Sequence, residues 1–194
     1  MEQALLEKAF IPGRPDNKRF MMGMITNWTQ VCNASLTAAA IAVYESCPDV
    51  AEKLISRAIN NHKEALTKIY APAGTYGEGP MYWEYGTTFS SMLLSVLEST
   101  YGTDFGIGKA EGFNRTLEFF SMTLSPSGKH FAWGDGGEDI GYRTLYAIYF
   151  LARFFNTQEY ILPEFDHWFQ NMLAKRSPYT TDVGSSAINR FVPL

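Results

Sequence analysis

The sequence is poor in the residues from which several large classes of site are built. Its 194 residues include two cysteines and three histidines, and no spacing of Cys and His resembles a zinc site. No glycine-rich loop follows a strand in the way that phosphate-binding loops do, and the nucleophile motif G-x-S-x-G does not occur. We therefore expect neither a metal nor another cofactor.

Basic charge and long apolar runs are scarce as well. Asp and Glu outnumber Lys and Arg by 20 to 16, which gives a net charge of -4 and no reason to expect nucleic acid. No apolar run reaches the roughly 20 residues that span a bilayer, so we expect no membrane partner. The N-terminal MEQALLEKAF also lacks the layout of a signal peptide.

The two cysteines give no indication of a disulfide. Cys32 and Cys47 are expected near the two ends of one helix, where they would be roughly 22 Å apart and far beyond disulfide reach. We expect both to be reduced thiols in the core.

What the sequence does contain is a series of helical patterns in which mostly apolar and amphipathic segments alternate. From Pro48 to Ile69 apolar residues recur at the spacing i, i+3, i+4, which predicts an amphipathic helix. The preceding segment 29–46 is nearly uncharged and rich in alanine, which predicts a helix buried on most sides. Two further pairs are expected, each an apolar helix followed by a shorter or more polar one: 83–101 with 113–124, and 142–155 with 163–175.

Three antiparallel pairs of this kind predict an all-α fold. We interpret it as an incomplete α/α toroid whose inner helices begin near residues 29, 83 and 141, with a plain orthogonal helical bundle as the alternative. The chain 1–194 is then a single toroid domain or half-domain. It has a leading segment 1–26, a helical core 27–175 and a tail 176–194.

In a toroid, every connection from an outer to an inner helix emerges on the same rim. Two such connections, 71–82 and 125–141, are the most glycine-rich, aromatic and acidic loops of the chain, and the segment before the first inner helix reaches the same rim. Because loops on a rigid scaffold commonly carry function, we predict a site there. Its candidate residues are Asn27, Trp28, Glu78, Tyr82, Trp83, Tyr85, His130, Trp133, Asp135 and Glu138.

Three motifs in this order, TNWTQVCNAS, GTYGEGPMYWEYG and FAWGDGG, resemble the heparinase II/III-like polysaccharide lyases. These enzymes pair an α/α toroid with a β-sandwich and cleave uronate polysaccharides by β-elimination. The resemblance implies an acidic polysaccharide as partner and a parent protein that is periplasmic or extracellular. It also implies that this chain is a fragment without the β-sandwich.

By this resemblance, Asn27 matches the residue that binds the uronate carboxylate, and Tyr82 matches the catalytic tyrosine, with Tyr85 as its competitor. An amide or a helix N-terminus can stabilise the carboxylate charge, and a tyrosine can then transfer the proton. Trp28 and Trp83 stand where many members of the family have histidine. The remaining candidates are predicted to bind substrate: Glu78, Trp83, Trp28, Trp133, Asp135 and His130.

Other interpretations of these residues stay open. Asn27 is a favoured residue for capping a helix, and Asp135 and Glu138 are typical of turns. Glu78 with Asp135 or Glu138 could be the carboxylate pair of a glycoside hydrolase. The aromatic rim could also belong to a non-catalytic glycan-binding module. An exposed apolar inner wall would favour self-association or pairing with a missing segment.

Overall fold

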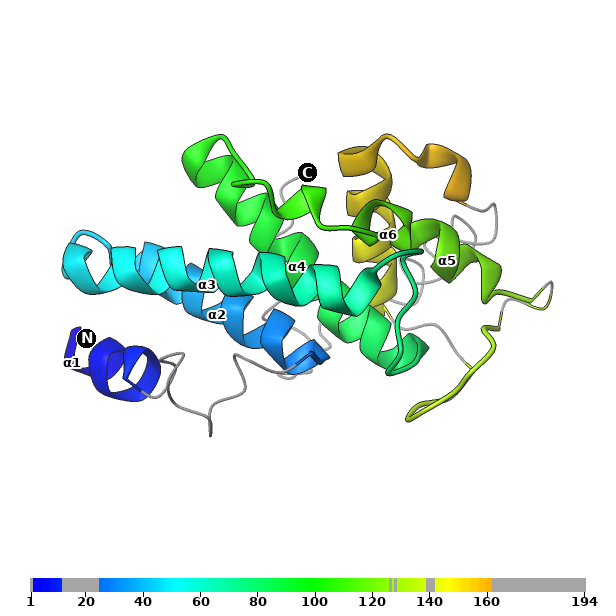
Figure 1. Cartoon of the computed structure of the whole chain (residues 1–194), viewed down its shortest axis with the longest axis horizontal. Coiled ribbons are helices and arrows are strands. Elements are labelled where there is room, and N and C mark those ends of the chain that lie inside the picture. Colours follow the sequence, from blue (N-terminus) through cyan, green and yellow to red (C-terminus); the bar gives the residue numbers. More distant parts are fainter. Residues whose placement is uncertain (1, 12–24, 126, 128, 139–141, 162–194) are drawn as a thin grey trace, which may run out of the picture. The chain divides into compact units, whose positions relative to one another are not determined.

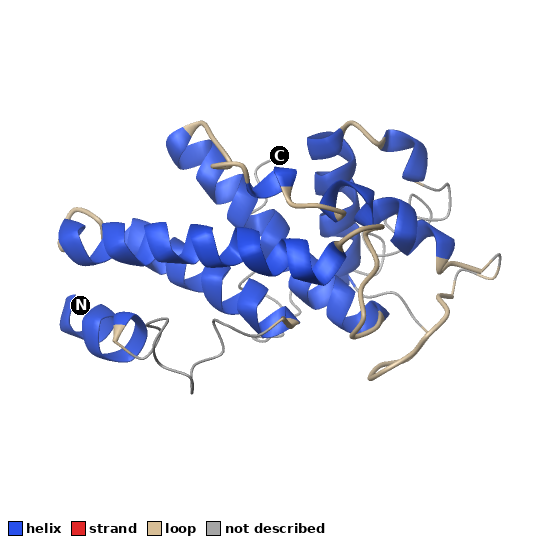
Figure 2. Cartoon of the chain, viewed as in Figure 1, coloured by secondary structure: helices blue, strands red, loops and turns tan. Residues whose placement is uncertain are grey.

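The computed structural model describes residues 2–11, 25–125, 127, 129–138 and 142–161, and most of these residues are in helices joined by loops. The expected helix 163–175 and the tail 176–194 lie outside these residues, as does much of the leading segment. Between the described residues, β-pairing is limited to one isolated bridge, which joins Leu124 to His130. The predicted all-α class is confirmed (Figure 2).

The helices follow the predicted order (Figure 1). They are α1 (Glu2–Leu5), the π-helical η1 (Leu6–Phe10), α2 (Asn27–Ala42), α3 (Pro48–Tyr70), α4 (Pro80–Tyr101), the 3-10 helices η3 (Ile107–Lys109) and η4 (Phe113–Arg115), α5 (Thr116–Met122), α6 (Tyr142–Phe155) and the 3-10 helix η5 (Gln158–Tyr160).

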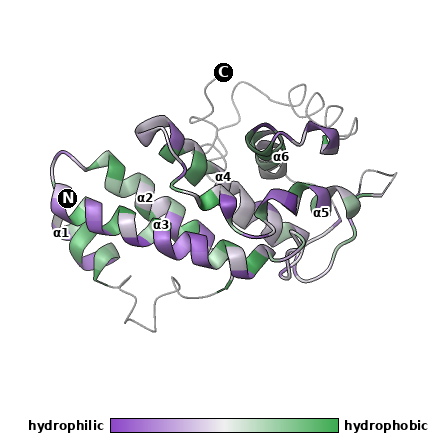
Figure 3. Ribbon diagram, turned by 45° about the horizontal axis from the view of Figure 1, so that its top comes forward, coloured by the Kyte–Doolittle hydropathy of each residue, from purple (hydrophilic) through white to green (hydrophobic). Residues whose placement is uncertain are grey.

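Helix α3 is the amphipathic helix that the periodicity predicts. Pro48 opens its first turn, where the missing N–H of proline costs nothing. Its buried residues recur every three or four positions, and Figure 3 shows more hydrophilic colour on α3 than on α6. The periodic pattern therefore marks the face that packs on the rest of the chain.

Helices α2 and α4 form the centre of the packing. Helix α2 contacts both α3 and α4, and α4 in turn contacts both α2 and α6. The mostly apolar helices α2, α4 and α6 thus follow one another as neighbours, with α3 lying against α2. The described residues establish this order of contacts, and closure into a ring stays a prediction.

Helix α2 departs from expectation in its burial and its bounds. It begins at Asn27 and ends at Ala42, so Cys47 lies outside it and directly precedes α3. One of its sides, with Ser35, Ala38 and Ala39, is exposed, so the prediction that it is buried on most sides is wrong. Both cysteines are free, as expected, although Cys32 is only half-buried.

Candidate functional site

Two of the loops predicted to share a rim are in direct backbone contact. Gly79 has a φ of 97°, a conformation suited to glycine, and a Cβ placed on it would lie 2.1 Å from the carbonyl oxygen of Trp133. A Cβ on Gly134 would lie 2.7 Å from the carbonyl oxygen of Glu78. The 71–79 loop and the 129–138 loop therefore lie against each other, as the sequence predicted.

The 71–79 loop also reaches the N-terminus of α2 through Glu78. Its carboxylate accepts hydrogen bonds from the backbone N–H of Asn27 (2.6 Å) and from Nδ2 of the Asn27 side chain (2.9 Å). Thr26, at the N-cap position, makes no side-chain capping bond. A carboxylate at this place satisfies an orphan N–H group and interacts favourably with the helix dipole. Glu78 therefore takes the capping role that was one interpretation of Asn27.

This pairing also determines what Asn27 can offer to a ligand. Asn27 is 2% exposed, and its Oδ1 atom has no hydrogen-bond partner between the described residues. The donor groups that would hold a substrate carboxylate are engaged by Glu78. An anionic ligand at this helix end would have to displace that carboxylate.

Tyr82, near the start of α4, and Asp135, in the 129–138 loop, form the second pair of the site. The Tyr82 hydroxyl donates to Asp135 Oδ2 at 2.9 Å, and both side chains reach solvent. This hydrogen bond, together with the negative charge of Asp135, raises the pKa of Tyr82 above its ordinary value. Tyr82 is therefore protonated at neutral pH, and its hydroxyl hydrogen is directed at Asp135.

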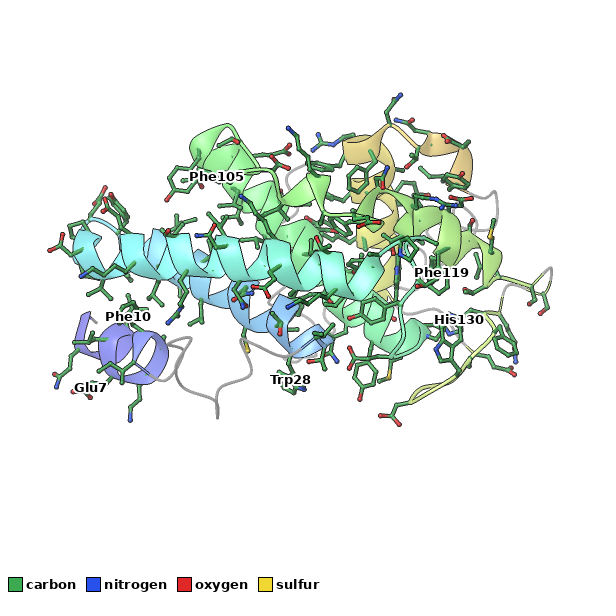
Figure 4. All side chains as sticks on the ribbon, viewed as in Figure 1. Glu7, Phe10, Trp28, Phe105, Phe119 and His130 are labelled. Carbon is green, nitrogen blue, oxygen red and sulfur yellow. The ribbon has the colours of Figure 1, made fainter. Side chains whose placement is uncertain are left out.

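The two tryptophans next to the predicted catalytic residues lie in opposite environments. Trp83 is fully buried, stacked on Phe120 at 4.0 Å between ring centroids, and its Nε1–H donates to Thr116 Oγ1 at 2.7 Å. The Trp83 ring cannot stack on a substrate, because both of its faces are inside the core. Trp28 is 46% exposed, and Figure 4 shows it pointing away from the neighbouring helices.

The remaining candidates divide between packing and surface. His130 is buried, with Nε2 3.0 Å from the carbonyl oxygen of Gly137 and its ring edge-on to Phe120, so its visible role is to hold the loop. Tyr85 is half-buried with its ring against Phe89. Glu138 is exposed and forms an ion pair with Lys129 at 2.9 Å, which lowers the pKa of Glu138.

Behind the site lies a buried polar network that sequence reasoning missed. Gln30 is at its centre: its Oε1 accepts from the Tyr76 hydroxyl at 2.6 Å, and its Nε2 donates to the Tyr70 hydroxyl at 2.9 Å. The same Nε2 donates to Ser90 Oγ at 2.8 Å, and Ser90 in turn lies 3.1 Å from Nε2 of His62. Burial raises the pKa of both tyrosines and lowers the pKa of His62 to about 3.

The network joins the two segments that carry the first pair of the site. Tyr76 precedes Glu78 by two residues, and Gln30 follows Asn27 by one helical turn. The bond between Tyr76 and Gln30 therefore holds the 71–79 loop to α2 at the point where Glu78 meets Asn27. A sequence signal existed, because Gln30, Asn33 and Thr37 form a polar stripe at helical spacing in a helix that has no charged residue.

No protein-family model matches the chain, and no curated protein matches it either. The described residues hold no group of three or more side chains suited to a metal ion. No helix in the described ranges is both long and apolar enough to cross a bilayer.

Proposed function

We propose that the chain is a carbohydrate-active domain of the uronate-lyase type, with its helix pairs forming part of an α/α toroid. The observation that carries the proposal is the meeting of two hydrogen-bonded pairs, Asn27 with Glu78 and Tyr82 with Asp135. The members of each pair are 51 and 53 residues apart in the sequence, and the loops that carry Glu78 and Asp135 touch. The contact sequence α2, α4, α6 supports the toroid.

Tyr82 has the properties of a proton donor in such a reaction. In β-elimination a base removes the proton next to the uronate carboxylate, the electron pair forms a C=C bond, and the C–O bond to the leaving sugar breaks. The leaving oxygen then takes a proton. A phenol is protonated at neutral pH and can supply this proton, although the raised pKa makes Tyr82 a weaker acid than a free tyrosine. Tyr85, one turn along α4, is the competitor for this role.

Asn27 and the N-terminus of α2 would stabilise the substrate carboxylate in this scheme. Both donors now bind Glu78, so substrate binding requires that the Glu78 carboxylate move aside or share them. An amide together with a helix N-terminus is suited to the negative charge that develops on the uronate.

The first prediction concerns Tyr82→Phe, which removes the hydroxyl and keeps the ring. Purified chain is incubated with alginate, heparan sulfate or polygalacturonate, and the ultraviolet absorbance of an unsaturated uronate is followed. We expect the wild type to form this product on at least one polymer and Tyr82→Phe to form none while still binding it. Tyr101→Phe, an exposed tyrosine at the far end of α4, is the matched control. Full activity of Tyr82→Phe would contradict the assignment.

A second candidate function is a glycan-binding module without catalysis, and two observations favour it. Trp28 follows Asn27 and is exposed, where it can present a ring to a sugar, and the donors of Asn27 are engaged by Glu78. Binding of a uronate polymer by the wild type with no unsaturated product on any of them would support this function over elimination.

The geometry gives less support to a hydrolase. A general acid of that class needs a raised carboxyl pKa, whereas Lys129 lowers the pKa of Glu138. Asp135 and Glu78 are each engaged by a neighbouring donor.

A further inference from the structure

Three aromatic side chains gather beside the Tyr82–Asp135 pair, and two of them were not among the sequence candidates. Trp133 lies between Phe119 of α5, at 6.0 Å between ring centroids, and Phe131 of its own loop, at 6.1 Å. We call these three residues the aromatic platform. Figure 4 shows Phe119 at α5, near the loop that carries His130.

The platform is exposed although its residues are large and apolar. Phe131 is 74% exposed, and Phe119 and Trp133 are half-buried. Met122, at the end of α5, is 74% exposed as well. Leaving so much apolar surface in water costs free energy, and contiguous exposed apolar patches commonly mark sites of interaction.

Backbone hydrogen bonds hold the part of the loop that carries Phe131. The N–H of Phe131 donates to the carbonyl oxygen of Thr123 at 2.7 Å, and the N–H of His130 donates to that of Glu138 at 3.0 Å. His130 points inward to Phe120, so its neighbour Phe131 points outward. The exposure of Phe131 is thus a consequence of a hydrogen-bonded loop.

The platform is continuous with the hydrogen-bonding part of the site. Trp133 packs its carbonyl oxygen against Gly79, and two residues later Asp135 accepts from Tyr82 through Oδ2. The loop that carries the Trp133 ring therefore also carries the carboxylate that binds the Tyr82 hydroxyl.

From this geometry we infer that the aromatic platform is a binding subsite for the uncharged C–H face of a sugar ring. The inference rests on the proposed function only in taking the ligand to be a glycan. It adds Phe131 and Phe119 to the site and names the part of the ligand that binds there, which is the C–H face of a sugar ring. Asp135 would accept hydrogen bonds from the hydroxyl groups at the edge of that ring.

The chemistry of the platform favours this occupant over a charged one. Aromatic ring faces carry partial negative charge, which attracts the electron-poor C–H bonds of a pyranose and repels a carboxylate. The adjacent Asp135 adds to that repulsion. A sugar that carries a carboxylate can bind here only with the carboxylate directed away from the platform.

The test is electrophoresis of the folded chain in native gels that contain alginate, hyaluronan or glucomannan. We expect retardation of the wild type by at least one polymer. Trp133→Ala and Phe131→Ala should weaken binding to that polymer roughly tenfold, since truncating an aromatic anchor commonly costs more than 1 kcal/mol. Trp133→Phe should restore much of it. The control is Phe105→Ala, an exposed aromatic beyond the other end of α4.

Several results would overturn the inference. One is retardation of both platform variants equal to that of the wild type, and another is no retardation of the wild type by any of the three polymers. A dimer that forms on its own and is lost in Phe131→Ala, without glycan binding, would assign the platform to protein contact. Platform variants that lose binding although no unsaturated product ever forms would support the subsite and reject elimination. Loss of the unsaturated product in Tyr82→Phe, together with platform variants that bind as tightly as the wild type, would support elimination and reject the subsite.

Discussion

At the scale of single residues, His62 has the clearest energetic consequence. Its imidazole is completely buried, with Nε2 3.1 Å from Ser90 Oγ and with no partner for Nδ1 among the described residues. Burial disfavours the charged form and lowers the pKa of His62 from its ordinary 6.5 to about 3. Between these values the unfolded chain binds the proton and the folded chain does not. Stability is therefore complete above the unfolded pKa and falls as the pH decreases below it.

The second prediction follows from this shift. Lowering the pH from 7 to 4.5 should remove about 2–3 kcal/mol of the unfolding free energy through His62 alone. His62→Gln cannot ionise but can still bond Ser90, so its stability should depend less steeply on pH over this range. Urea denaturation at several pH values measures the unfolding free energy of the wild type and of His62→Gln. Because the carboxyl groups are common to the two, parallel pH profiles would show that His62 does not carry the effect.

At the scale of elements, α2 depends on a side chain that is distant in sequence. Its N-cap residue Thr26 makes no capping bond, and Glu78 supplies the acceptor for Asn27 instead. The same end of α2 is tied to the 71–79 loop through Gln30 and Tyr76. The start of the helix and the first half of the site are therefore one structural unit.

The third prediction tests this unit through Glu78→Ala. The change leaves the backbone N–H and the Nδ2 group of Asn27 without their acceptor, which should lower the unfolding free energy by about 1–3 kcal/mol. Glu78→Gln retains an acceptor and should cost less. Glu138→Ala removes an exposed carboxylate of the neighbouring loop and should leave the melting temperature nearly unchanged. Equal melting temperatures for Glu78→Ala and the wild type would argue against the capping role.

The fourth prediction concerns the contact between α2 and α4 at Gly86. A Cβ there would lie 2.2 Å from Oε1 of Gln30 and 2.5 Å from the hydroxyl of Tyr76, both of them buried. Gly86→Ala should therefore destabilise the fold by about 1–3 kcal/mol, despite the better helix propensity of alanine. Gly77→Ala, where a Cβ meets no atom within 4 Å, should change stability by less than about 0.5 kcal/mol. Similar stability of the two variants would contradict the packing described at Gly86.

The helices could be predicted from the sequence, but the orientation of several side chains could not. The sequence patterns placed α3 and α4 within a few residues, and the two glycine-rich loops, expected on one rim, lie against each other. The opposite burial of Trp28 and Trp83 depends on the face that each helix turns to its neighbours, which tertiary packing decides. Glu78 as partner of Asn27 and the exposure of Phe131 depend on long-range contacts, which carry no local pattern.

At the scale of the whole molecule, the central claim is that the first turn of α2 and two loops form one glycan site. The helices α2 and α4 supply the rigid support, and the buried network around Gln30 links it to the 71–79 loop. The 129–138 loop adds Asp135 and the aromatic platform. Stability measurements test the end of α2 and the buried network, but only a ligand can show that these parts and the 129–138 loop act together.

The most direct measurement is an NMR titration of the isotope-labelled chain with a uronate oligosaccharide, such as an alginate trimer. We predict that the largest shifts occur at the backbone amides of Asn27, Glu78 and Tyr82 and at the indole N–H of Trp133. The amide of Phe105, about 30 Å away along the 22-residue α4, should stay unchanged. Shifts that cluster around Phe105, or no shifts at saturating oligosaccharide, would contradict the claim.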